Sequence, residues 1–173
     1  MLRRFKCSFL VFALAVAVSS PAAAKSVKPR LLVQEGDWKA YVLTDNNQKV
    51  CYMVSEPKKM EGKYSTRGKV YVLVTHRPSE NTQDVFSYIA GYSYKSGASV
   101  KLKIDGQSFT LFTQGDTAWA EDPKTDKKIS GLIRSGSKVT VQGTSSRGTL
   151  TTDTFSLKGS GVAYKAISKE CRV

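Results

Sequence analysis

The strongest constraint on the fold is the segment from residue 100 to residue 112, which has the pattern of a β-hairpin. Apolar and polar residues alternate over 100–105, as they do in a strand with one face in water. Asp105-Gly106 comes next, and 108–112 is again rich in aromatic and apolar residues. An Asp-Gly pair between two such runs is a strong signal for a two-residue turn. The sequence therefore predicts two antiparallel strands joined at Asp105-Gly106.

Several further runs have the composition of strands. Residues 69–75 carry apolar side chains on both faces, which is typical of a central strand. Other strands are predicted at 38–43, 50–55, 85–92, 118–120, 138–142 and 149–157. Loops rich in Gly, Ser, Asn and Pro separate these runs. The pattern favours a mainly β fold, either a β-sandwich or an open barrel of about 8–9 strands.

Two short helices are expected between and after these strands. Residues 124–135 lack alternation, and their apolar side chains share one helical face before a glycine ends the helix. The last helix is predicted at 160–171, at the C-terminus. There Ala163, Ile167 and Cys171 are spaced four residues apart and form one stripe, which we expect to pack on the sheet.

The N-terminus has the pattern of an export signal. A basic start is followed by the apolar run 9–18 and by small residues at Ala22–Ala24, an order typical of a secretory signal peptide. A membrane anchor is the alternative, but the apolar run is shorter than the roughly 20 residues of a spanning helix. We expect a cleaved signal peptide over 1–24 and a single β-rich domain over 25–173. No transmembrane span is predicted in the mature chain.

The two cysteines after the leader, Cys51 and Cys171, predict a disulfide. In an oxidising compartment an even pair of cysteines is more often joined than free. Closing a loop of about 120 residues would stabilise the fold by roughly 4 to 5 kcal/mol in the chain-entropy account. Two buried thiols are the alternative. A disulfide would tie the last helix to the strand that holds Cys51.

Catalytic and metal-binding patterns are missing from the sequence. His76 is the one histidine, and it stands where a central strand runs into a turn at Arg77-Pro78, which favours a structural role. There is no G-x-S-x-G elbow and no H-E-x-x-H pair. A lone histidine and two joined cysteines leave scattered carboxylates as metal ligands. We predict no enzyme activity, no catalytic residues, no metal and no cofactor.

Positive charge is the more informative feature. The chain has 27 basic and 14 acidic side chains, and the leader holds three of the basic ones, so the mature chain carries a formal charge of about +10. Five basic residues lie within a dozen positions around Tyr64: Lys58, Lys59, Lys63, Arg67 and Lys69. They form either a binding patch for an acidic polysaccharide, an anionic lipid or an acidic protein, or a solvated loop. Nucleic acid is not expected as a partner of an exported protein.

A second candidate site is the hydroxyl-rich segment from Thr144 to Thr154. Its turn at Arg147-Gly148 is interpreted as a recognition loop with Arg147 at the tip, because loops on rigid scaffolds often carry binding. A solvated hairpin is the alternative. Trp38 and Trp119 are predicted as core anchors, since large aromatic side chains dominate small β cores, and an exposed tryptophan would instead be a binding platform.

An ordered set of motifs resembles a known family. The set comprises Gly36–Tyr41, Val50–Tyr52, Thr75–Pro78, Phe112–Trp119 and Gly143–Gly159, with Cys171 near the end. This order is similar to the invasion associated locus B family of exported bacterial proteins, over nearly all of the mature chain. The resemblance implies a small periplasmic or outer-membrane-associated β domain, linked in pathogens to host-cell invasion and virulence. The family supplies no catalytic residues to carry over.

These observations favour an exported, non-enzymatic binding protein of the bacterial cell envelope. We expect it in the periplasm, at the outer membrane by peripheral association, or at the cell surface. Its expected partner is a protein or an anionic component of the envelope or host surface. A structural or stress-related periplasmic protein without a host role is the alternative, followed by an enzyme or enzyme inhibitor. The partner, oligomeric state and strand order do not follow from the sequence.

Overall fold

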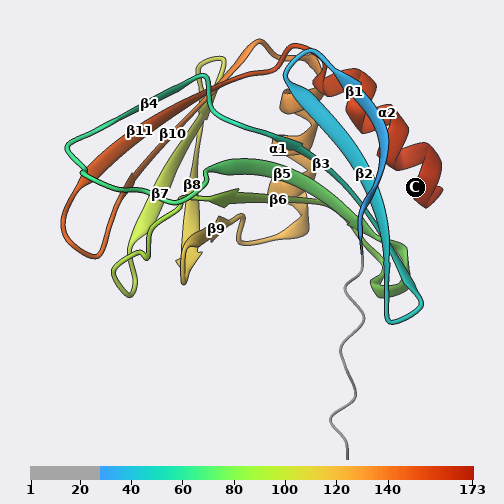
Figure 1. Ribbon diagram of the computed structural model, residues 1–173, viewed down its shortest axis with the longest axis horizontal. Helices are drawn as coiled ribbons and strands as arrows, with labels where there is room; N and C mark the ends of the chain where they lie inside the picture. Colours follow the sequence, from blue (N-terminus) through green and yellow to red (C-terminus); the bar gives the residue numbers. More distant parts are fainter. Residues whose placement is uncertain (1–27) are drawn as a thin grey trace, which may run out of the picture.

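A computed structural model describes residues 28–173 and shows one large antiparallel sheet with two helices (Figure 1). The sheet contains eleven strands in the order β1-β2-β3-β5-β6-β9-β8-β7-β10-β11-β4. The strands are β1 (Arg30–Glu35), β2 (Trp38–Asp45), β3 (Gln48–Ser55), β4 (Lys59–Gly62), β5 (Tyr71–Arg77), β6 (Thr82–Ile89), β7 (Ser99–Ile104), β8 (Gln107–Gln114), β9 (Thr117–Trp119), β10 (Lys138–Thr144) and β11 (Leu150–Ser156). The helices are α1 (Pro123–Ser135) and α2 (Ser160–Cys171), and a 3₁₀ turn, Pro78–Glu80, follows β5.

The mainly β prediction is confirmed, but residues 28–173 form one open sheet of eleven strands and not the predicted sandwich or open barrel of about 8–9 strands. The protein has a single open sheet, and its two edge strands, β1 and β4, were not predicted. Both have mostly exposed side chains, and β4 is exposed at all four positions. An edge strand pairs on one side only, so its sequence needs no apolar face and gives no alternation.

The predicted hairpin is confirmed. β7 and β8 pair antiparallel, with Val100 opposite Leu111 and Leu102 opposite Phe109. Asp105 and Gly106 have φ of 43° and 97°, the positive values that a tight hairpin turn requires of both central residues. The predicted central strand is also central, since β5 lies between β3 and β6.

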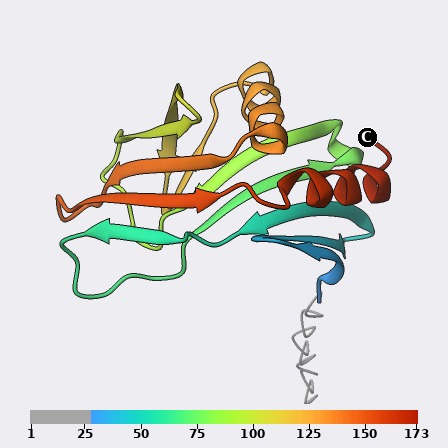
Figure 2. The same ribbon diagram turned by 90° about the horizontal axis from the view of Figure 1, so that it is seen from above.

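One face of the sheet, here called the inner face, holds the core. α2 packs against β2 and β3, and α1 packs against β6, as Figures 1 and 2 show with α2 in red. Strands far apart in the sheet also meet across the core: the rings of Tyr88 on β6 and Phe155 on β11 pack edge to face with centroids 6.3 Å apart. The sheet therefore curls far enough for β6 to face β11, although β9, β8, β7 and β10 lie between them.

Both helices lie where they were predicted. Ala163, Ile167 and Cys171 are buried, so the predicted stripe of α2 does face the core. The Cys51–Cys171 disulfide is present, with 6.1 Å between the Cα atoms, and joins α2 to β3. At the start of α1, Asp122 caps the helix by accepting the backbone N–H groups of Lys124 and Thr125.

The two tryptophans differ in role. Trp38 is fully buried, and its indole Nε1 donates to the carbonyl of Ser156 at 3.0 Å, so the core prediction is confirmed for this residue. Trp119 is half-buried and stands opposite Ser87 and Phe112, on the face of the sheet away from the core. Its prediction as a core anchor is wrong, because β9 places it on the outward side of the pleat.

Candidate ligand-binding site

Three loops at one end of the sheet enclose a cavity of about 460 Å³. They are residues 63–68 between β4 and β5, residues 91–93 after β6, and residues 145–149 between β10 and β11. We call this space the loop cavity. Thr151, on β11 just after the third loop, also lines it. Its size lies within the range of about 300–1,000 Å³ that small-molecule sites occupy.

Backbone hydrogen bonds fix the three loops to one another. The N–H of Gly68 donates to the carbonyl of Gly91 at 2.9 Å, and the N–H of Ser146 donates to the carbonyl of Ser93 at 2.8 Å. Gly91 has φ of +70°, and a Cβ there would lie 2.5 Å from the Gly68 carbonyl oxygen. Only glycine therefore allows this close approach of two chains, and the cavity is built before any ligand arrives.

A buried ion pair lies beneath the loops. The Arg67 guanidinium donates to the Asp153 carboxylate in a bidentate arrangement, with N–O distances of 2.8 and 2.6 Å. The side chains are 3% and 0% exposed. Tyr88 also donates its hydroxyl to Asp153, and Arg67 Nε donates to the Ala90 carbonyl at 2.7 Å. Every polar group of this cluster thus has a partner, which a buried charge pair needs in order to be tolerated.

The contacts within this cluster also shift the pKa values of its members. Burial by itself lowers the pKa of Arg67, but the hydrogen bonds to Asp153 and the electrostatic effects of Tyr88 and Asp153 together raise that pKa above its usual value. Burial, together with the Asp153 charge, raises the pKa of Tyr88. Both side chains therefore keep their protons at physiological pH. Arg67 is a structural cation committed to Asp153 and is not available to bind a ligand's charge.

Two tyrosine rings flank the Arg67 side chain. Its guanidinium carbon lies 5.4 Å from the ring centroid of Tyr64 and 4.9 Å from that of Tyr92, within reach of cation–π attraction. The Tyr92 hydroxyl is 2.8 Å from Thr151 Oγ1. The buried pair therefore holds two aromatic side chains that line the cavity, each from a different loop.

The exposed part of the loop cavity is basic and rich in hydroxyl groups. Lys63 and Arg147 both line it, and neither forms an ion pair with another residue of 28–173. No Asp or Glu of residues 28–173 lines it. Its hydroxyl groups include those of Ser65, Thr66, Ser93, Ser146, Thr149 and Thr151. Such a surface can bind a negative charge through two cations and can donate or accept hydrogen bonds around it.

The five residues of the predicted basic patch differ in their contacts. Lys63 and Arg67 reach the loop cavity, whereas Lys58 pairs with Asp37 and Lys59 pairs with Glu61. Lys69 is exposed and does not line the cavity. Arg147, from the other predicted site, does line it. Lys63 from the predicted basic patch and Arg147 from the predicted recognition loop therefore line the same cavity.

His76 lies away from the loop cavity in a buried polar network. The backbone N–H of Asp84 donates to its Nδ1 at 3.0 Å, and its Nε2 is 3.2 Å from Ser168 Oγ. The Asp84 carboxylate in turn accepts the hydroxyls of Ser130 and Tyr164 at 2.9 and 2.7 Å. Burial lowers the pKa of His76, against the opposing effect of Asp84. The network joins α1 and α2 to the sheet, which is consistent with a structural role for His76.

Two further features of residues 28–173 bear on the kind of site. Within this range no three His, Cys, Asp or Glu side chains gather in a way that could hold a metal ion. Neither described helix has the length and apolar character needed to cross a bilayer. The predicted signal peptide, 1–24, lies outside the described residues.

The fold and site define a small, disulfide-bonded protein built on one open antiparallel sheet, with a basic cavity formed by three of its loops. The family model described as Invasion associated locus B (IalB) protein matches residues 38–168. The chain belongs to this family, as its motifs predicted. No curated protein and no solved structure matches the chain.

Proposed function

We propose that this chain is an exported, non-enzymatic binding protein of the bacterial cell envelope, and that it binds an acidic polysaccharide through the loop cavity. The observation that carries the proposal is that Lys63 and Arg147 both line a hydroxyl-rich cavity in which the described part of the chain places no carboxylate. A polysaccharide with acidic groups offers both the negative charges and the hydroxyls that such a surface can satisfy.

Export is supported by the leader pattern of 1–24 and by the disulfide. A disulfide between residues 120 positions apart persists in an oxidising compartment such as the periplasm or the cell exterior. The net positive charge of the chain, +13 in full, attracts anionic surfaces of the envelope and speeds association with them. Membership of the invasion associated locus B family adds host-surface glycans to the candidate partners.

Binding rather than catalysis is supported by the chemistry of the loop cavity. A general base or nucleophile needs a side chain that can exchange a proton at working pH. Lys63 and Arg147 are cations, and burial raises the pKa of Tyr92, so that its hydroxyl keeps its proton. His76 is buried elsewhere. The cavity thus offers charge, hydrogen bonds and aromatic surface, which are binding functions.

The test is calorimetric titration of the mature chain with polygalacturonate. Neutral dextran is the control polysaccharide, which is expected not to bind. We expect the double variant Lys63→Gln/Arg147→Gln to bind at least tenfold more weakly and to lose much of its salt dependence. The matched control is Lys101→Gln/Lys103→Gln, which removes the same charge from two exposed lysines of β7. Equal weakening by both pairs would mean that net charge alone causes binding, and would overturn the proposal.

Location is tested separately by protease digestion of intact cells beside cells with an opened outer membrane. Cleavage on intact cells would favour a host-surface glycan as the partner. Protection until the outer membrane is opened would favour an envelope polysaccharide. Digestion patterns of a cytoplasmic marker protein control for cell lysis.

A further inference from the structure

The face of the sheet opposite the core, here called the outer face, has two halves of different composition. Both helices pack on the inner face, so the outer face has no helix over it among residues 28–173. In one half, outward side chains of β7, β10 and β11 are lysines and threonines: Lys101, Lys103, Lys138, Thr140, Thr152 and Thr154. This is the usual composition of a solvated sheet surface.

The other half of the outer face is apolar and aromatic. Its outward side chains lie on β1, β2, β3, β5, β9 and β8 and include Leu31, Tyr41, Tyr52, Leu73, Trp119 and Phe112. Leu31 is 48% exposed and Phe112 42%. The lysines and threonines of the first half are the residues expected where this sheet faces water. The second half has large apolar side chains in the equivalent outward positions, so it is suited to contact with a partner.

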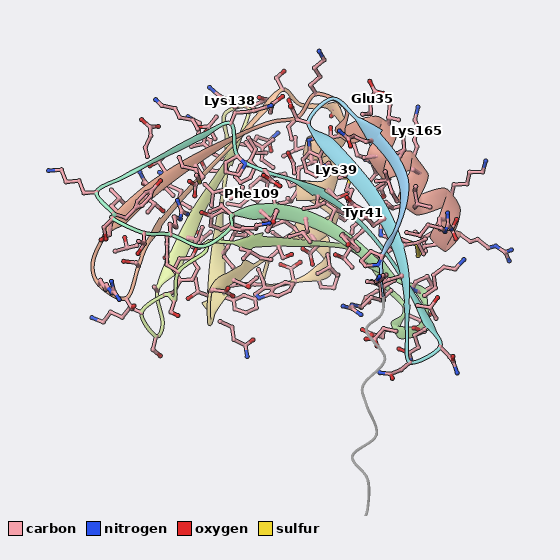
Figure 3. All side chains as sticks on the ribbon, viewed as in Figure 1. Glu35, Lys39, Tyr41, Phe109, Lys138 and Lys165 are labelled. Atoms are coloured by element: carbon pink, nitrogen blue, oxygen red, sulfur yellow. A yellow bond between two sulfur atoms is a disulfide. The ribbon has the colours of Figure 1, made fainter. Side chains whose placement is uncertain are left out.

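A groove of about 780 Å³ runs over the aromatic half. The rings of Tyr41 and Tyr52 are stacked at its base, with centroids 5.3 Å apart and an interplanar angle of 22°. Tyr71, Leu73 and Ile89 continue the apolar lining across β5 and β6. Lys39 and Tyr41 of β2, which Figure 3 labels, both line the groove. We call this space the outer groove.

Charged side chains lie at one end of the outer groove. Lys58 and Asp37 neutralise each other in an ion pair. Lys39 stands opposite Val54, Glu56 follows two residues further along the chain, and both side chains line the groove. Neither Lys39 nor Glu56 has an ion-pair partner within residues 28–173. The occupant that complements this end carries one negative and one positive charge.

We propose that the outer groove binds a membrane phospholipid with a zwitterionic headgroup, its acyl chain over the stacked tyrosines. The phosphate would lie at Lys39 and the headgroup amine at Glu56. Tyrosine suits this position, since its ring is apolar and its hydroxyl can remain in water. A second copy of the chain fits less well, because two strongly basic molecules repel each other across a shared face.

The experiment is calorimetric titration of the mature chain with lysophosphatidylethanolamine below its micelle concentration, at three acyl chain lengths. Burial of the chain predicts up to about a fifteenfold loss of affinity for each pair of methylene groups removed. Tyr41→Thr/Leu73→Thr gives this half the composition of the other and keeps strand propensity, and it should weaken binding at least tenfold. Phe112→Thr is the matched control, since Phe112 is an exposed aromatic of the outer face that does not line the groove; it should change affinity less than twofold.

The headgroup assignment has its own variants. Glu56→Gln should abolish the preference for lysophosphatidylethanolamine over lysophosphatidylglycerol, and Lys39→Gln should weaken both. Affinity that is independent of chain length, or equal affinity for a neutral glucoside detergent of the same length, would overturn the proposal. So would a dimer in sedimentation that Tyr41→Thr/Leu73→Thr dissociates, because the groove would then be covered by a second copy. Thermal melts of each variant confirm that it is folded.

Discussion

Replacing Arg67 with methionine should destabilise the protein strongly, by about 4 kcal/mol. Methionine keeps most of the side-chain volume but leaves the Asp153 carboxylate, which is 0% exposed, with the Tyr88 hydroxyl as its remaining strong donor. Removing one partner of a buried ion pair costs about 3–5 kcal/mol, because the other charge is left uncompensated. The Ala90 carbonyl also loses the Arg67 Nε donor. For a chain of this size the melting temperature should fall by about 8–16 °C.

The assay is equilibrium unfolding in urea at pH 7, with the free energy of unfolding extrapolated to water. Arg67→Met/Asp153→Asn should recover part of the loss, since it removes the orphaned charge while the amide oxygen still accepts the Tyr88 hydroxyl. Lys63→Met controls for the loop: Lys63 is exposed, so this change should stay within about 0.5 kcal/mol. A cost below about 1 kcal/mol for Arg67→Met, or no recovery on adding Asp153→Asn, would show that Arg67 and Asp153 do not form a buried, energetically coupled pair.

Three further predictions concern stability. Cys51→Ser/Cys171→Ser should lower the free energy of unfolding by up to about 4–5 kcal/mol in urea titrations, because a loop of 120 residues is opened in the unfolded chain. Burial raises the pKa of Asp126 from 3.8 to about 6, so its contribution to stability is complete below pH 3.8 and is lost as pH rises through 6. Asp126→Asn should therefore reduce the change of the urea unfolding midpoint between pH 4 and 7. An unchanged pH dependence of that midpoint would contradict this prediction. Burial lowers the pKa of His76 below 6.5, so its contribution to stability is present above pH 6.5 and is lost as pH falls through the lowered folded-state pKa. His76→Gln should therefore reduce the loss of stability at acidic pH in the same urea titrations. An equal loss in the variant would show that His76 does not cause it.

The elements predicted from the sequence are those whose patterns are local. The alternation around Asp105-Gly106 and the apolar run of β5 each specify their strand within a few residues. β4 could not be found in this way. Its four residues, Lys59–Gly62, are all exposed, and they form a strand because β11, almost a hundred residues later, offers an unpaired edge. A pairing partner distant in sequence leaves no periodicity to detect.

The candidate site was predictable in charge but not in geometry. Lys63 and Arg147 were each selected because they are basic and lie in polar loops, and both line the loop cavity. Arg67 met the same criterion, yet it is buried against Asp153, 86 residues away in sequence. The 91–93 loop carries no charge and was missed. A signal was present in Gly68 and Gly91, since glycine is required where two backbones approach closely, but the sequence does not say which two chains meet.

The placement of Arg67 determines how binding experiments on this protein must be interpreted. Its guanidinium holds Asp153, the Ala90 carbonyl and the rings of two tyrosines, so it fixes the positions of two of the three loops around the cavity. A loss of binding in an Arg67 variant would therefore reflect a distorted cavity as much as a lost contact. Lys63 and Arg147 project from loops that backbone hydrogen bonds already hold in place. Weakened binding at unchanged stability in their variants is thus the result that would assign the ligand's negative charge to the loop cavity.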